Sequence, residues 1–123
     1  MRFRPEHHLT RQSDIRAVRE QGRRLDCRAF TVWWKPRENT SAAGPRVCVI
    51  ASTNAVGHAV LRNRAKRRLR EVFRQHQERV PATCDLLLIA RAAATTWSRA
   101  DLDKKFVDAC GQITSAVPAE TKS

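Results

Sequence analysis

Thirteen consecutive residues, 62–74, carry seven of the chain's 24 basic side chains and a single acid, Glu71. The segment has a net charge of +6, half of the +12 of the whole chain, and its apolar residues recur at helical spacing. Like charges four residues apart on a helix repel each other by roughly 0.2–0.5 kcal/mol per pair. A face that meets only water is therefore a poor explanation, and the sequence predicts a helix that packs on one side and binds a polyanion on the other.

The predicted helix runs from about residue 57 or 58 to residue 79, and Pro81 ends it. Its packing side spans about 120° of a helical wheel and consists of Leu61, Ala65, Leu69, Val72, Phe73 and His76. The opposite arc holds Asn63, Arg64, Lys66, Arg67, Arg70 and Arg74. This division predicts a helix that lies on a sheet and displays its arginines.

A short surface helix and a strand region precede this segment. Thr10 or Ser13 is expected to cap the helix, which runs to residue 21, and Gly22 to end it in the left-handed conformation. Residues 23–37 alternate with period two, which indicates strand structure. The alternation places on one face Phe30, Val32 and Trp34.

Two further strands and a helix complete the order. Residues 47–51 are predicted to form a buried strand paired with the preceding one, and residues 86–90 a strand covered on both faces. Ser98 is expected to cap the last helix, with Asp101 at the third position. The inner stripe of that helix is predicted to be Leu102, Phe106, Cys110, Ile113 and Val117. The order α-β-β(-β)-α-β-α predicts an α+β fold, a two-layer sandwich of helices against a small sheet.

The length of 123 residues suits one domain, expected at 9–117, with a flexible arm at 1–8 and a disordered tail at 118–123. Arginine outnumbers lysine nineteen to five, and a guanidinium grips phosphate oxygens bidentately, which favours nucleic acid as the partner. A membrane surface is the weaker alternative, because it requires a bulky apolar helix face. No apolar run reaches the roughly 18 residues of a membrane span, and the N-terminal segment lacks a secretory apolar core, so the cytoplasm is expected.

The strands expected on both sides of the basic helix argue against duplex DNA, whose reading helix usually follows another helix closely, and mildly favour RNA. No catalytic constellation is present, since the acids are dispersed and no nucleophile or phosphate-loop motif occurs. The four cysteines, Cys27, Cys48, Cys84 and Cys110, show no metal-ligand spacing and are expected to be buried, reduced thiols.

Residues 56–60 read Val-Gly-His-Ala-Val, and residues 61–73 read Leu-Arg-Asn-Arg-Ala-Lys-Arg-Arg-Leu-Arg-Glu-Val-Phe. This run closely resembles the RNR motif of the bacterial ribonuclease P protein subunit. The resemblance extends over roughly residues 9–115. It implies the order α-β-β-β-α-β-α with a left-handed crossover, a fold like that of domain 2 of ribosomal protein S5.

The same resemblance implies a function. The family's holoenzyme is an endoribonuclease that removes the 5′ leader from precursor tRNA, and its catalytic RNA subunit, with bound Mg²⁺, performs the hydrolysis. No catalytic residue and no metal ligand are then expected in this chain. The positions that match the RNA-contacting motif are Arg62, Asn63, Arg64, Lys66, Arg67, Arg68 and Arg70.

The resemblance also implies a cleft for the leader between the first helix and the sheet, at Ile15, Arg19 and Trp33. The family usually carries two aromatics on the first helix, where this chain has Ile15 and Arg19. Arg19 is expected to stack on a base or to pair with phosphate, and core packing is the alternative for Trp33. Residues 52–55 read Ser-Thr-Asn-Ala where the family often has Ser-Lys-Lys, so phosphate binding is expected to rest more on the arginines.

Two other classes of function stay open at this point. A ribosomal-type or RNA-chaperone protein would bind RNA without taking part in a reaction. An autonomous nuclease would cleave RNA by itself, which the missing acid–base cluster makes a poor fit.

Overall fold

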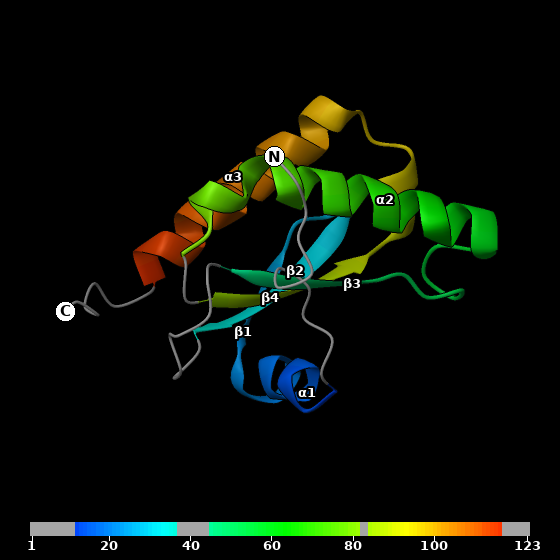
Figure 1. The fold of residues 1–123 in the computed structure, drawn as a ribbon. Coiled ribbons are helices and arrows are strands. Elements are labelled where there is room, and N and C mark those ends of the chain that lie inside the picture. The colour runs from blue at the N-terminus through cyan, green and yellow to red at the C-terminus, as the bar shows by residue number, and fades with distance from the viewer. Residues whose placement is uncertain (1–11, 37–44, 82–83, 117–123) are drawn as a thin grey trace.

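The structure, a computed structural model, describes residues 12–36, 45–81 and 84–116 (Figure 1). The predicted arm at 1–8, most of the connecting loop and the predicted tail at 118–123 lie outside the described residues. The helices are α1 (Gln12–Gln21), α2 (Ala59–His76) and α3 (Arg99–Ala116), with the short 3-10 helices η2 (Gln77–Arg79) and η3 (Ala92–Thr95). The strands are β1 (Arg23–Asp26), β2 (Phe30–Pro36), β3 (Arg46–Ile50) and β4 (Cys84–Ala90). The α+β class and the predicted order are confirmed.

The four strands form one sheet in the order β1-β2-β4-β3. β2 is antiparallel to β1 and β4, and β3 runs parallel to β4. The predicted pairing of residues 47–51 with the preceding strand is therefore wrong, because β4 lies between β2 and β3. Leu86 shows this directly, since it is opposite Trp34 on one side and Val47 on the other. The β3–α2–β4 connection is the expected crossover between parallel strands, and its left hand stays a prediction from the resemblance.

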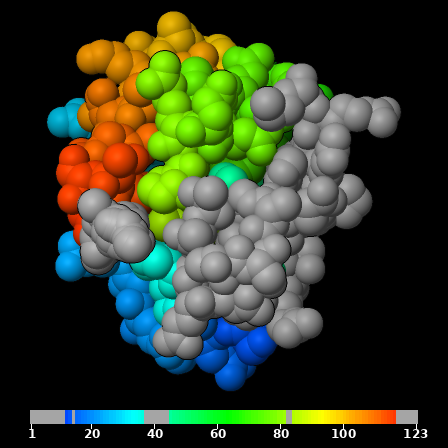
Figure 2. Space-filling model, turned by 60° about the vertical axis from the view of Figure 1, so that its left-hand side comes forward, coloured from blue at the N-terminus to red at the C-terminus, as the bar shows by residue number. Residues whose placement is uncertain are grey.

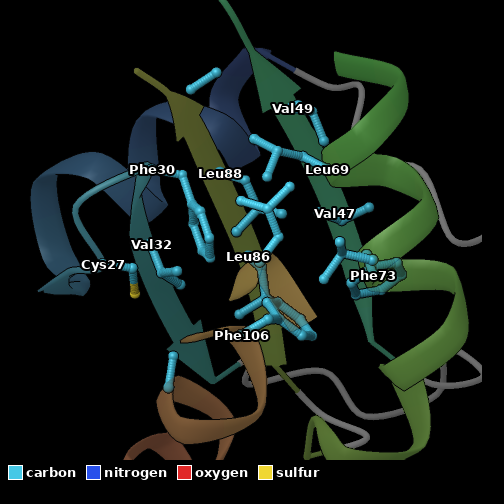
Figure 3. Close-up of a cluster of buried hydrophobic side chains, with 14 of the residues drawn as sticks. Cys27, Phe30, Val32, Val47, Val49, Leu69, Phe73, Leu86, Leu88 and Phe106 are labelled. Atoms are coloured by element: carbon cyan, nitrogen blue, oxygen red, sulfur yellow. The ribbon is translucent and has the colours of Figure 1, made fainter. Parts of the chain in front are cut away.

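The sheet is covered on both faces. α2 and α3 lie on one face and α1 lies on the other (Figure 1). The predicted sandwich thus holds for α2 and α3, and α1 adds cover on the second face. The main core fills the space between the sheet and the two long helices, as Figure 3 shows for Phe30, Val32 and Leu88. Within it, the rings of Phe73 and Phe106 join α2 to α3 edge to face, with centroids 6.3 Å apart.

The packing face of α2 agrees with the helical wheel except at its start. The buried residues of α2 are Ala65, Leu69, Val72 and Phe73, and His76 is half-buried. Leu61, predicted to pack on the sheet, is instead 42% exposed. The reason is visible in Figure 1, where the first turns of α2 extend past the ends of the strands. An apolar side chain on this overhanging part has no sheet beneath it.

Gly22 ends α1, as predicted, but for a different reason. Its N–H donates to the carbonyl oxygen of Val18 at 3.0 Å, yet its φ is not positive. A Cβ at this position would lie 2.4 Å from the Val18 oxygen and 2.5 Å from the Trp34 oxygen. Glycine is thus required because α1 and β2 approach closely here, and not for a left-handed turn.

The cap of α3 is confirmed, since the N–H of Asp101 donates to Ser98 Oγ at 3.1 Å. The inner stripe of α3 is buried at Leu102, Phe106, Cys110 and Ile113, and Val117 lies outside the described residues. None of the helices in the described ranges has the length and apolar character needed to cross a membrane.

Candidate nucleic-acid interface

Five of the predicted RNA-binding residues lie along the outer side of α2, away from its buried stripe, and they are Asn63, Arg64, Lys66, Arg67 and Arg70. The other two, Arg62 and Arg68, flank the buried stripe, and Arg62 Nε is itself buried. Asn63, Arg64, Arg67 and Arg70 are exposed, whereas Arg62, Lys66 and Arg68 are half-buried. In the space-filling view of Figure 2, α2 (green) forms part of the molecular surface beside α3 (orange). The helix has no acidic side chain in its first turn. The surface of the five outer residues, Asn63, Arg64, Lys66, Arg67 and Arg70, is called the basic face of α2 below.

Two arginines on one flank of α2 are tied to the segment after β4. Arg64 Nε donates to the carbonyl oxygen of Thr95 at 3.2 Å, and Arg68 Nε donates to that of Ala94 at 2.9 Å. The Nη2 group of Arg68 also contacts the carbonyl oxygen of Trp97. Burial lowers the pKa of Arg68, as do the nearby charges of Arg64 and Arg99. Arg68 is therefore placed as a tether between α2 and η3, and its contact with RNA stays a prediction.

The opposite flank of the basic face reaches the edge strand β3. Partial burial raises the pKa of the Cys48 thiol, while the positive charges of Arg70 and Lys66 act to lower it. α2 packs beside β3, so this flank of the helix faces the β3 edge of the sheet. The basic face therefore extends from η3, across the top of α2, to the β3 edge of the sheet.

Arg74, at the end of α2, is held by an acid of its own helix. Its Nε donates to Glu71 Oε1 at 3.0 Å, and its Nη2 contacts the second carboxylate oxygen. The hydrogen bond from Arg74 lowers the pKa of Glu71. Glu71 thus offsets the charge of Arg74 at this end of the helix.

The residues of the second predicted site, the leader cleft, lie on the other face of the sheet. Ile15 and Trp33 are both partly buried and pack against a small apolar cluster around Val18 and Leu87. The guanidinium carbon of Arg19 lies 5.5 Å from the centre of the Trp33 ring. The structure thus brings all three predicted cleft residues together, and it places Trp33 outside the main core.

Sequence reasoning missed two residues of this surface, Cys48 and Ile50 of β3. Both are half-buried and belong to the same cluster as Trp33. They lie on this face because β3 pairs with β4, with Cys48 opposite Leu87 and Ile50 opposite Ile89. The alternation of buried and partly buried residues in β3 shows that Cys48 and Ile50 share one face of the strand. Which face of the sheet this is could be assigned only once the pairing of β3 with β4 was known. The other three cysteines, Cys27, Cys84 and Cys110, are buried and form no disulfide, as expected.

Acidic groups near this surface are engaged in ion pairs. Asp85, 5% exposed, accepts hydrogen bonds from Arg46 Nε at 2.9 Å and from its Nη2 at 2.8 Å. Asp26 pairs with Arg91 at 3.2 Å. In the part of the chain that the structure describes, no three His, Cys, Asp or Glu side chains are grouped so that they would hold a metal ion.

Comparison with known proteins adds independent findings. Residues 3–114 match the model of the family described as Ribonuclease P. The chain is 34% identical over 108 residues to the ribonuclease P protein component of Acidothermus cellulolyticus, covering 88% of each chain. It is 37% identical over 104 residues to that of Rhodococcus opacus, covering 81% of this chain and 82% of the relative.

Solved structures show the same fold. The ribonuclease P protein from Thermotoga maritima superposes with a TM-score of 0.73 at 21% identity, covering 86% of this chain and 96% of that one. The protein from Staphylococcus aureus gives a TM-score of 0.70 at 24% identity, covering 88% and 94%. At these identities the likeness concerns the architecture alone.

Proposed function

The chain belongs to the ribonuclease P protein family, and from this we propose that it is the protein subunit of ribonuclease P, the endoribonuclease holoenzyme of tRNA processing. In this proposal α2 binds the catalytic RNA subunit, and the surface at Trp33 binds the 5′ leader of precursor tRNA. The protein thereby assists removal of the leader in the cytoplasm.

The observation that carries the proposal is the placement of the basic face of α2. Its arginines are displayed on a helix whose other side is fixed by four buried residues, so their positions are set before any partner arrives. Arg64, Arg67 and Arg70 follow one another at three-residue spacing and span about 9 Å along the helix. A row of guanidinium groups along a fixed helix neutralises successive phosphates and releases counterions from the RNA.

The leader surface is suited to single-stranded RNA. Trp33 is only partly buried, and Arg19 lies over its ring, so an unpaired base can stack beside a cation that meets its phosphate. Ile15, Cys48 and Ile50 add apolar surface around it. These contacts discriminate little between bases, which suits a protein that must accept many leaders.

In this proposal the chemistry belongs to the RNA partner. Mg²⁺ would be bound by that RNA and would activate water for attack on the scissile phosphodiester. The residues of this chain position the substrate and reduce the repulsion between phosphates, so that the ions are bound at lower concentration. Four of the described acids, Asp26, Glu71, Asp85 and Asp103, are held in ion pairs and are placed to stabilise the fold.

The test measures the affinity of the protein for its cognate catalytic RNA over a range of salt concentrations. Each neutralised phosphate contributes about −0.7 to −0.9 to the slope of log affinity against log salt. Changing Arg64, Arg67 and Arg70 together to Ala should flatten the slope by about two to three. A control with the same loss of charge changes Arg24, Arg79 and Lys104, which are exposed and lie off α2. An equal effect of both sets would contradict the assignment of this face.

A processing assay separates this function from the alternatives. With cognate RNA and precursor tRNA at low Mg²⁺, the protein should stimulate release of the leader. Stable RNA binding without stimulation would favour an RNA chaperone, and cleavage by the protein alone would favour an autonomous nuclease.

A further inference from the structure

We propose that Val60 and Leu61, at the start of α2, form an apolar contact site for an unpaired nucleotide of the RNA partner. This inference rests on the proposed function and adds a contact that does not depend on charge. Val60 is 80% exposed and Leu61 is 42% exposed, and among the described residues they are the large apolar side chains that are exposed. They are adjacent, and both lie on the helix that carries the basic face.

The two side chains are held on a part of α2 that extends beyond the sheet (Figure 1). Gly57, with a φ of 127°, sits one helical turn before Leu61. A Cβ at Gly57 would lie 2.9 Å from Leu61 Cδ1, so the missing side chain leaves the space that Leu61 fills. Leu61 is thereby fixed against the turn, while Val60, whose β-branched side chain has few rotamers on a helix, projects into solvent. The apolar surface is ordered before a ligand arrives.

The surroundings of this pair are cationic. Asn63 and Arg64 lie one turn further along the helix from Val60, and Arg67 lies two turns along. Arg64 is held in place by Thr95. The first turn of α2 has no acid, and His58 provides no side-chain cap. A matching ligand therefore has an apolar surface at its centre and negative charge at its rim.

A nucleotide satisfies both conditions, because a base has apolar faces and its flanking phosphates are anionic. The base must be unpaired, since stacked bases of an RNA duplex present no free face. A membrane is a poorer match, because the broad apolar side of α2 is already packed on the sheet. A protein partner would have to bring acids to Arg64 and Arg67 and an apolar side chain to Val60.

The experiment compares Val60→Ser with the wild type in binding to the cognate catalytic RNA at several salt concentrations. Because the contact is apolar, Val60→Ser should raise Kd by about five- to tenfold at every salt concentration and leave the salt slope unchanged. Val60→Ile, which keeps an apolar side chain, should retain the wild-type affinity. Arg67→Ala should instead change the slope. Ala100→Ser, an exposed apolar-to-polar change on α3, is the matched control and should change neither.

Chemical probing of the RNA complex then locates the contact. Dimethyl sulfate should modify one or more unpaired bases in the Val60→Ser complex that the wild type protects. Superposable binding curves for Val60→Ser and wild type would overturn the inference, as would a change of slope in Val60→Ser. Unchanged RNA binding by Val60→Ser would also overturn the inference in favour of another ligand if the variant bound phosphatidylglycerol vesicles more weakly. The same would hold if the variant self-associated more weakly. If the RNA affinity of the wild-type protein did not depend on salt concentration, the proposed function itself would be contradicted.

Discussion

Arg68 Nε donates a hydrogen bond to the carbonyl oxygen of Ala94 at 2.9 Å, which joins the middle of the basic helix to a segment 26 residues later in the chain. The same guanidinium contacts the carbonyl oxygen of Trp97. Within a run of basic side chains, this one is directed to the protein's own backbone. It satisfies carbonyl groups of η3 and the following turn, and it sets the position of α2 relative to the end of β4.

Arg68→Met should lower stability more than it changes RNA binding. The variant removes the donors to Ala94 and Trp97 while keeping an unbranched chain, so the free energy of unfolding should fall by about 1–2 kcal/mol. Urea denaturation measures this fall. The salt slope of RNA binding should stay within experimental error of the wild type. Arg67→Ala is the matched control, and it should change the salt slope of RNA binding with little effect on the free energy of unfolding. If Arg68→Met changed the salt slope as much as Arg67→Ala does, Arg68 would not act as a tether.

Trp33→Leu should weaken binding of the leader specifically. The loss of a stacking surface is expected to reduce affinity for precursor tRNA by about tenfold, with little effect on mature tRNA, which has no leader. Fluorescence titration of the holoenzyme with both substrates measures the difference. Arg19→Gln should have a smaller effect, because a cation over an accessible aromatic ring contributes about 0.5–1 kcal/mol. An equal loss for mature tRNA would place Trp33 outside the leader site.

Glu71→Gln should strengthen RNA binding. The change removes the only acid of α2 and weakens its hold on Arg74, so the affinity should rise about two- to fivefold near 0.1 M salt. The salt slope should steepen by up to about 0.9. In the wild type the pKa of Glu71 is lowered from its ordinary value of 4.5. The carboxylate therefore keeps its charge at pH 4.5 and loses it only as pH falls through the lowered pKa of the folded protein. Acid pH should therefore not reproduce the effect of Glu71→Gln until below pH 4.5. Unchanged binding would show that Arg74 does not face the RNA.

Alkaline pH should destabilise the fold through its buried thiols. Burial raises the pKa of Cys110 from 9.0 to about 12 and that of Cys27 to about 11. The unfolded chain loses these protons first, so the stability is fully present below pH 9 and declines as pH rises above it. By pH 10.5 the raised pKa of each thiol should lower the free energy of unfolding by about 1–2 kcal/mol. Urea midpoints of Cys110→Ala and wild type between pH 8 and 10.5 measure this. Parallel pH profiles of the two proteins would contradict the expectation.

The sequence predicted the features that depend on neighbouring residues. The alternation at Phe30, Val32 and Trp34 indicated the core face of β2, and Ser98 was recognised as a cap because its partner is three residues away. The three cleft residues were brought together by the family resemblance, which extends over α1 and β2 as well as the motif on α2.

Other features depend on distant segments, and these the sequence did not predict. The pairing of β3 with β4 was missed because an antiparallel hairpin with β2 has the shorter connection, whereas the actual pairing requires the crossover through α2. Leu61 matched the apolar stripe, but its burial depended on where the sheet ends. Arg68 matched the RNA-binding motif, and its tether to Ala94 became visible only when η3 was placed beside α2.

The strand order has a consequence for the growing chain on the ribosome. β4 lies between β2 and β3 in the sheet but is the last of the four strands to be synthesised. Until residues 84–90 emerge, β3 has no neighbouring strand, and the apolar side of α2 has only part of its packing surface. The arginine-rich helix therefore leaves the ribosome before the sheet that supports it is complete. Completion of the domain is a late and cooperative event, triggered when its final third leaves the exit tunnel.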